Sequence, residues 1–248
     1  MASRDGSRIE CFRVTVAVVI MLILVPGMAI AQSWGVTGVQ LLHGRDFKLG
    51  ADERDILTFE HASGWQLGSN FFFFDVTSPF AGDTDIYGEW YSRLSWNKLG
   101  LRREGSGVLQ DVSFAASINA GQGFRAYLAG VTLHLRIPGF TFADVDVMAY
   151  DDRSDGDVTY IVTPAWDVPF KIAAAACRFR GFADLIGAEG VRSQQLLTQP
   201  QVLVDLGSLA GGARDRFFAG VEYQYWHNKY GVGGVSESLP QVMVLWQF

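Results

Sequence analysis

A histidine and a serine two residues apart are the first candidates for chemistry in this chain. His61 and Ser63 flank Ala62, so in an extended segment the imidazole and the hydroxyl fall on the same face. A base beside a hydroxyl is the minimum requirement for acyl transfer. Gly64 follows, and the sequence offers His61 no identifiable third partner to orient it. We therefore expect an interfacial histidine and a turn-forming serine, with catalysis as the alternative.

An acidic segment is the second candidate, as a cation site. Asp151, Asp152, Asp155 and Asp157 carry oxygen ligands suited to a hard cation. Arg153 occupies the position at which an EF-hand requires Asp or Asn, so that motif fails. The segment predicts a solvated loop, with cation bridging to lipopolysaccharide as the alternative. No histidine pair has zinc-ligand spacing, and we expect neither a metal nor a cofactor.

The elements that position these residues are strand-like. Segments rich in aromatic and β-branched residues recur about every 18 residues and are separated by Gly, Asp, Asn, Ser or Pro clusters. They predict strands over 34–42, 55–62, 69–77, 87–96, 108–119, 124–136, 140–150, 158–167, 170–184, 199–206, 216–227 and 241–248. The segment 182–195 comes nearest to a helical period and is expected to contain a short loop helix.

The last predicted strand indicates what kind of sheet these strands build. Val242, Val244, Trp246 and Phe248 share one wholly apolar face, whereas the alternate face is mixed. A barrel that closes by pairing its last strand with its first accommodates a chain that ends inside a strand, and an apolar outer face is typical of a membrane barrel. Several segments are also long enough to cross a bilayer. The prediction is an all-β, transmembrane, antiparallel up-and-down barrel of twelve strands; a soluble β-sandwich is the alternative.

In such a barrel the alternate positions line the lumen. The charged residues expected there are Glu60, Asp75, Glu89, Arg93, Asp111, His134, Arg136, Asp144, Asp146, Arg178, Arg180, Asp205 and Glu222. A lining with both signs in rough balance argues against strong ion selectivity and suits neutral polar solutes. The aromatic residues expected in the same phase are Phe71, Phe73, Tyr91, Phe140, Phe142 and Trp166. These rings either stack on a flat solute or plug the barrel as packing.

The N-terminus has the organisation of a secretory signal peptide. Three arginines precede an apolar run over 14–25, and Ala29-Ile30-Ala31 is a small-residue cleavage site. The expected domains are therefore a cleaved signal peptide over 1–31 and a barrel over 32–248. Removal of 1–31 changes the formal net charge from −6 to −7, because three arginines and two acidic residues leave with it. An acidic chain disfavours nucleic-acid polymers as partners.

Several segments resemble the Tsx-like nucleoside-specific channel-forming proteins of the outer membrane, including their OmpK-type relatives. The resembling segments are 56–65 (ILTFEHASGW), 68–76 (GSNFFFFDV), 87–91 (YGEWY), 223–231 (YQYWHNKYG) and the closing strand. Between about 106 and 213 the likeness lies in strand spacing more than in residue identity. The terminal Phe248 also resembles the assembly signal of bacterial outer-membrane barrels.

The resemblance implies a monomeric barrel in the outer membrane of a Gram-negative bacterium. Its narrow lumen would conduct nucleosides or similar small heteroaromatic solutes by passive diffusion through weak successive sites. Implied partners are outer-membrane lipid, lipopolysaccharide, the barrel-assembly machinery and a phage or colicin at the outer loops. Matching segments and inward phase together give the expected solute contacts, namely Phe71, Phe73, Asp75, Glu89, Tyr91 and Arg93.

Two other functions remain open beside this non-enzymatic channel. The His61 and Ser63 pair resembles that of outer membrane phospholipase A, another twelve-stranded barrel, which would make the chain a lipid-acting enzyme. The third alternative is a closed barrel that acts as a surface receptor or adhesin.

Overall fold

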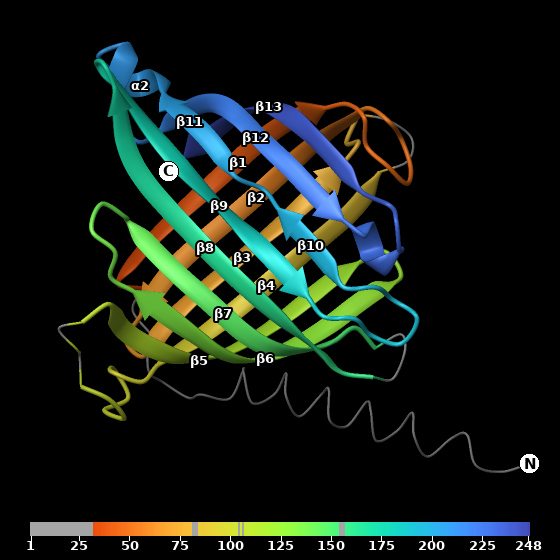
Figure 1. Ribbon diagram of the computed structural model, residues 1–248. Coiled ribbons are helices and arrows are strands. Elements are labelled where there is room, and N and C mark those ends of the chain that lie inside the picture. The colour runs from red at the N-terminus through yellow and green to blue at the C-terminus, as the bar shows by residue number, and fades with distance from the viewer. Residues whose placement is uncertain (1–31, 81–83, 104, 106, 154–156) are drawn as a thin grey trace, which may run out of the picture. The chain divides into compact units, whose positions relative to one another are not determined.

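The computed structural model describes residues 32–80, 84–103, 105, 107–153 and 157–248. The expected signal peptide, 1–31, lies outside them. Antiparallel strands form a single sheet that curls and closes on itself as a barrel (Figure 1). Closure joins the last strand to the first, with Gly44 opposite Gln241 and Gly38 opposite Gln247. The prediction that the ends of the sheet pair with each other is confirmed.

The strand bounds follow the predicted order. They are β1 (Trp34–Gly44), β2 (Arg54–Trp65), β3 (Gly68–Thr77), β4 (Asp85–Ser95), β5 (Leu109–Gly121), β6 (Phe124–Leu135), β7 (Phe142–Asp151), β8 (Thr159–Ile172), β9 (Ala175–Ile186), β10 (Gln195–Thr198), β11 (Gln201–Asp205), β12 (Phe217–His227) and β13 (Glu237–Gln247), with the short helices α2 (Leu206–Leu209) and η1 (Lys229–Gly231). β10 and β11 together fill one place between β9 and β12. Counted as one, they make a twelve-stranded barrel of the described residues. We call the rim where β1 begins and β13 ends the terminal rim, and the opposite rim the loop rim.

The turn expected between the eighth and ninth strands at 168–169 is wrong. β8 continues to Ile172, and Pro169 pairs with Arg178 inside the ladder. A proline is tolerated there because β7 begins only at Phe142, opposite Asp167, so Pro169 lies beyond the β7–β8 ladder and no neighbour on that side requires the missing amide donor. The turn lies instead at Ala173, which adopts a left-handed conformation.

The loop helix expected over 182–195 is also wrong. β9 extends to Ile186, and β10 already begins at Gln195, because pairing with β8 and β10 satisfies this backbone as a strand. β10 and β11 are separated by Gln199 and Pro200, and Pro200 cannot donate to a ladder. Gly181 of β9 lies beside this interruption, where a Cβ atom would approach the Gln199 carbonyl oxygen to 2.7 Å. The closing strand likewise starts at Glu237, four residues earlier than expected.

The outer surface of the barrel is apolar. Along β13, Val242, Val244 and Trp246 are exposed, whereas Gln241 and Leu245 in the alternate phase are fully buried. The same outward exposure holds for Leu41, Phe74, Ile86, Trp90, Leu94, Phe114, Ile118, Tyr127, Val147, Tyr160, Phe179, Val202, Val221 and Tyr223. So large an apolar surface is stable against acyl chains rather than water. Among the described residues, no helix is long and apolar enough to cross a membrane.

Candidate functional site in the barrel lumen

Aromatic side chains form a continuous row on the inner wall of β3, β4 and β6. The ring centroids of Phe124 and Tyr87 are 6.2 Å apart, as are those of Tyr87 and Phe73. Phe73 lies 6.1 Å from Phe71, and Phe71 lies 6.2 Å from Tyr91. Phe124 opens β6 at the loop rim, whereas Phe71 and Tyr91 lie near the middle of their strands. This aromatic row therefore descends from the loop rim to mid-barrel.

Carboxylates lie between and beside the rings of the aromatic row. Glu89 accepts hydrogen bonds from the hydroxyls of Tyr87 (2.6 Å) and Tyr91 (2.5 Å) and from the amide of Asn119 (3.0 Å). Asp75 accepts one from the Thr58 hydroxyl at 2.5 Å. These donors fix the carboxylates beside the aromatic faces, where their remaining lone pairs can accept hydrogen bonds from a solute.

Arg93 lies below the aromatic row and is held from two sides. Its Nη2 donates to Asp146 Oδ2 at 2.7 Å, and its Nε donates to Thr132 Oγ1 at 3.0 Å. The guanidinium also lies 5.2 Å from the centroid of the Tyr91 ring. The structure thus brings all six expected solute contacts together on the neighbouring strands β3 and β4.

The inner wall is solvent-accessible only in part. On β2 every residue except Gly64 is half-buried, and on β3 the inward Phe71, Phe73 and Asp75 are half-buried as well. On β13, by contrast, the inward Gln241 and Leu245 are fully buried. Solvent therefore reaches the wall that carries the aromatic row and is excluded from the wall built by β11, β12, β13 and β1.

On the excluded side of the lumen, a polar network lies beside the buried apolar side chains Leu42, Leu203, Phe218, Met243 and Leu245. We call it the glutamine cluster, made of Gln40, Gln199, Gln201, Glu222, Gln224 and Gln241. Glu222 is its centre and accepts from Gln201 Nε2 at 2.7 Å and from Gln241 Nε2 at 2.8 Å. Amide donors thus satisfy a buried carboxylate, which makes the cluster a rigid filling rather than an open space.

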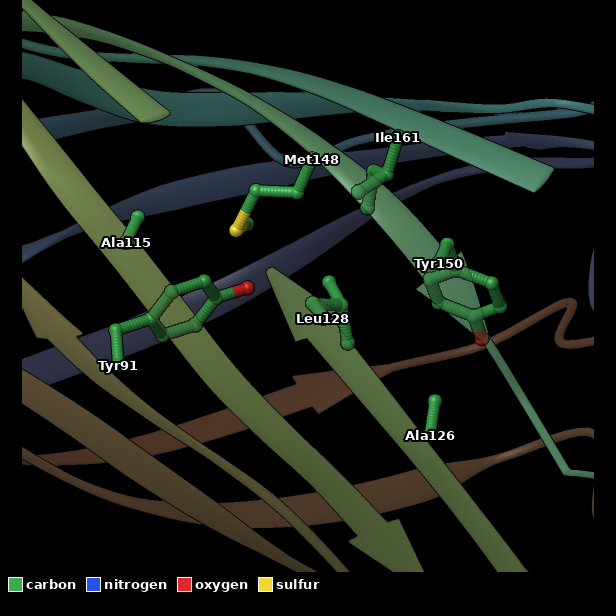
Figure 2. Packing of buried hydrophobic residues seen from close by; sticks show 7 residues of the cluster. All are labelled: Tyr91, Ala115, Ala126, Leu128, Met148, Tyr150 and Ile161. Atoms are coloured by element: carbon green, nitrogen blue, oxygen red, sulfur yellow. The ribbon is translucent and has the colours of Figure 1, made fainter. Parts of the chain in front are cut away.

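An apolar cluster fills the wall of β4 to β8. It consists of Tyr91, Ala115, Ala126, Leu128, Met148, Tyr150 and Ile161 (Figure 2). Phe71 and Phe124 of the aromatic row pack against it. The row is therefore backed by packing at Tyr91 and is accessible to solvent at Phe71 and Phe73. Tyr91 thus serves as packing, whereas Phe71 and Phe73 offer a surface on which a flat solute can stack.

Other predicted lumen charges are paired within the barrel. Asp111 accepts from Ser95 Oγ at 2.5 Å, and Asp144 Oδ1 lies 2.8 Å from His134 Nδ1. Arg178 donates to Gln247 Oε1 at 3.1 Å.

Two predicted lumen charges lie at the terminal rim. Asp205 ends β11 and accepts from the Ser208 amide at 3.1 Å, so it caps α2. Arg136 follows the end of β6 and is exposed.

Sequence reasoning missed several inward charges. Asp167 and Asp184 face inward, since Asp167 is the strand partner of inward Arg180 and lies 3.7 Å from Arg178 Nε, and Asp184 accepts a hydrogen bond from the Thr163 hydroxyl. Away from the rims, the inward carboxylates are Glu60, Asp75, Glu89, Asp111, Asp144, Asp146, Asp167, Asp184 and Glu222, whereas the inward cations are Arg93, Arg178 and Arg180. Inward positions at the rims carry Asp85, Glu237, Arg54 and Lys171, and the buried Lys229 lies beside Glu237. The expectation of a balanced lining is therefore wrong for the described inner wall, which is acidic.

Lys229 forms a buried ion pair at the loop rim. Its Nζ lies 2.6 Å from Glu237 Oε1, and the two side chains are 1% and 0% exposed. The ammonium is 4.9 Å from the Trp226 ring and 5.8 Å from the Phe47 ring. Burial lowers the pKa of Lys229, against the opposing effect of Glu237. Glu237 also accepts from the Lys48 amide at 2.8 Å, so the pair ties the β1–β2 loop to the β12–β13 loop.

Three aromatic residues that were expected in the lumen lie outside the aromatic row. Trp166 faces outward, contrary to expectation. Its strand partner is Gly181, and the centroid of its ring lies 5.7 Å from that of Phe179, which is itself outward. Phe142 begins β7 at the terminal rim, and Phe140 precedes it; both are exposed. Neither belongs to the aromatic row.

The candidate catalytic pair lies on the outward face. His61 Nδ1 is 2.8 Å from Thr37 Oγ1, and its ring is 5.5 Å from that of Phe72. Ser63 is paired with Asn70 in the β2–β3 ladder. A threonine in place of a carboxylate gives His61 no charged group to orient and stabilise an imidazolium. Both residues lie within β2, not in a turn.

The acidic segment is described only in part, since Asp155 and Gly156 lie outside the described residues. Asp151 pairs with Arg153 at 2.9 Å, and Asp152 pairs with Arg192 at 2.7 Å. Arginines thus pair with Asp151 and Asp152, two of the carboxylates that a cation site would use. Elsewhere in the described part of the chain, no group of His, Cys, Asp and Glu has the arrangement of a metal site.

These features define a closed twelve-stranded barrel with an apolar outer surface and an inner wall that carries apolar clusters and an excess of carboxylates. The KdgM porin in complex with disordered oligogalacturonate and the KdgM porin each match with a TM-score of 0.51 and 10% identity, covering 85% of this chain and 99% of that chain. The translocator domain of autotransporter NalP from Neisseria meningitidis matches with a TM-score of 0.35 and 12% identity, covering 96% of this chain and 97% of that one. The chain therefore has the fold of an outer-membrane porin.

The comparisons by sequence leave the family unassigned. No protein-family model and no curated protein matches the chain. Membership of the Tsx-like family is therefore not confirmed.

Proposed function

We propose that the protein is a passive outer-membrane channel for small solutes that carry a flat aromatic ring, with nucleosides as the leading class. The observation that carries this proposal is the aromatic row on the solvent-accessible part of the inner wall, with Asp75 and Glu89 beside it. A base stacked on one aromatic side chain gains about 1 to 3 kcal/mol. The carboxylates supply acceptors for sugar hydroxyls and exocyclic amines.

The spacing of the rings suits conduction. Neighbouring centroids lie 6.1 to 6.2 Å apart, so a solute can leave one ring as it engages the next. Passage requires several weak sites rather than one tight site, because a tightly held solute would block its own path. Phe71, Phe73 and Tyr87 offer such a series.

The acidic lining narrows the solute class. One of the solved porins of the same fold was captured with oligogalacturonate, an acidic saccharide. On the described inner wall of the present chain, carboxylates outnumber cations, so an acidic solute would be repelled. Neutral or cationic ring-bearing solutes fit better. Outer-membrane lipid, lipopolysaccharide and the barrel-assembly machinery are the partners that such a monomeric barrel requires, and the outer loops are candidates for phage or colicin contacts.

Liposome swelling tests the proposal. Proteoliposomes containing the mature barrel are placed in isosmotic uridine, N-acetylglucosamine or glucuronate. We expect uridine to enter at least about twice as fast as N-acetylglucosamine, a neutral sugar of similar size, and glucuronate to enter most slowly. Equal rates for uridine and N-acetylglucosamine would exclude selection by the aromatic row. If the proteoliposomes do not swell in any of the three solutes, the result would favour a closed barrel that acts as a surface receptor.

A further inference from the structure

One ion pair crosses the lumen. Arg180 Nη1 lies 2.9 Å from Glu60 Oε1, and Arg180 Nη2 lies 3.0 Å from Glu60 Oε2, which is a bidentate arrangement. Around the barrel, β9 and β2 are separated by β11, β12, β13 and β1 on one side and by β3 to β8 on the other. The two residues therefore reach toward each other from nearly opposite walls, and we call them the cross-lumen bridge.

The cross-lumen bridge borders the glutamine cluster. Arg180 Nε donates to Gln201 Oε1 at 2.7 Å, and Gln40 Nε2 donates to Glu60 Oε2 at 2.9 Å. Gln201 in turn donates to Gln40 at 3.3 Å, which completes a ring of hydrogen bonds. Both bridge side chains nevertheless keep 16% of their surface exposed, unlike the fully buried Gln241 behind them. One side of the bridge is filled, and the other side meets solvent.

The aromatic row leads to the cross-lumen bridge. Glu60 lies directly opposite Phe73 in the β2–β3 ladder, and both Glu60 and Arg180 are near the middle of their strands. A solute that descends from Tyr87 to Phe73 therefore meets a carboxylate and a guanidinium at mid-barrel. The solvent-accessible path past the bridge lies on the side of the aromatic row, because the glutamine cluster occupies the opposite side and the apolar cluster covers the wall of β4 to β8.

We propose that the cross-lumen bridge is the constriction of the channel and sets its charge selectivity, an inference that rests on the proposed function. Paired, the two charges cancel and admit neutral solutes. Other charges close to the bridge are the carboxylates Glu222 and Asp75, together with Asp167, whose Oδ2 lies 3.7 Å from Arg178 Nε. Loss of the Arg180 charge therefore leaves Glu60 without its cation beside Glu222 and Asp75 at the constriction, and loss of the Glu60 charge leaves Arg180 with one carboxylate partner fewer.

Planar-bilayer recording of the mature barrel tests this inference. The K⁺/Cl⁻ permeability ratio is obtained from the reversal potential in a KCl gradient. We expect Arg180→Gln to raise the ratio about threefold or more and Glu60→Gln to lower it, because local charge governs ion entry at a constriction. The exchange of both residues, Glu60→Arg with Arg180→Glu, is expected to return the ratio toward the wild-type value. Arg180→Lys keeps the charge and should stay near the wild-type ratio even though it loses the bidentate geometry.

A matched control and the wild type separate the outcomes. Arg45→Gln removes an arginine from an exposed ion pair with Glu53 and should leave the ratio unchanged. If the wild type conducts but the bridge variants all share its ratio, the bridge is not the constriction, although the channel stands. If the folded wild type and all folded variants fail to conduct, the proposed function itself is rejected. Heat-modifiable electrophoretic mobility identifies folded barrels, and Glu60→Gln and Arg180→Gln shift the ratio in opposite directions, so either folded variant alone decides.

Discussion

Replacement of Phe73 by alanine is expected to weaken nucleoside block of the channel current by about 5- to 150-fold. This range is the equivalent of the roughly 1 to 3 kcal/mol that one aromatic platform contributes to stacking. Phe73 is the member of the aromatic row that links Tyr87 above to Phe71 below, so its loss interrupts the series as well as removing one site. The measurement is the concentration of adenosine that halves single-channel current in planar bilayers.

Phe74→Ala is the matched control for this experiment. Phe74 belongs to the same strand and carries the same side chain, but it faces outward and is 40% exposed. Its replacement should leave block by adenosine unchanged, because it never meets the solute. If Phe73→Ala and Phe74→Ala weaken block equally, or if neither does, the aromatic row is not the binding surface.

Replacement of Lys229 by methionine is expected to destabilise the barrel by about 3 to 5 kcal/mol. The change leaves Glu237 fully buried without its cation, and breaking a buried pair from one side costs about that much. The loss should appear as a lower midpoint of urea unfolding in detergent or lipid, followed by tryptophan fluorescence. Because the pair joins two loops at the loop rim, proteolysis within the β12–β13 loop should also become faster.

Two further variants distinguish a buried pair from a general effect of lost charge. Arg45→Met removes a cation from the exposed pair with Glu53, and we expect a change within about 1 kcal/mol. Lys229→Met combined with Glu237→Leu removes both buried charges and should recover much of the lost stability. A single Lys229→Met variant as stable as Arg45→Met would show that Glu237 finds another partner or solvent.

Together, the inner features give the lumen a consistent organisation. The apolar cluster and the glutamine cluster fill two sectors, and the aromatic row with Asp75 and Glu89 occupies the sector that solvent reaches. The cross-lumen bridge lies where these sectors meet. The selectivity for uncharged solutes would then depend on the aromatic row, and the selectivity between cations and anions would depend on the cross-lumen bridge. The two sets of variants test these roles separately.

The barrel itself was predictable from the sequence because side-chain alternation is local. Val242, Val244 and Trp246 had to share one face of any strand, and so had Phe71 and Phe73. Turn residues bounded most strands, and an apolar outer face required lipid. Register failed where local signals conflict: Pro169 suggested a turn, but the strand continued because its amide side had no partner. Trp166 lies inside both the expected strand and β8, and its outward face follows from the alternation with inward Ala165 and Asp167.

The sequence by itself therefore determined the strand order, through the turn residues between consecutive strands. It also determined the apolar outer face and the inward phase of the aromatic row, because both depend on a period of two residues. Only the tertiary structure decided which inward side chains meet. Glu60 and Arg180 are 120 positions apart, and Lys229 reaches Glu237 only through the fold of one loop. Barrel closure places β2 and β9 on nearly opposite walls of one narrow lumen, and no periodicity along a strand encodes a distance across it.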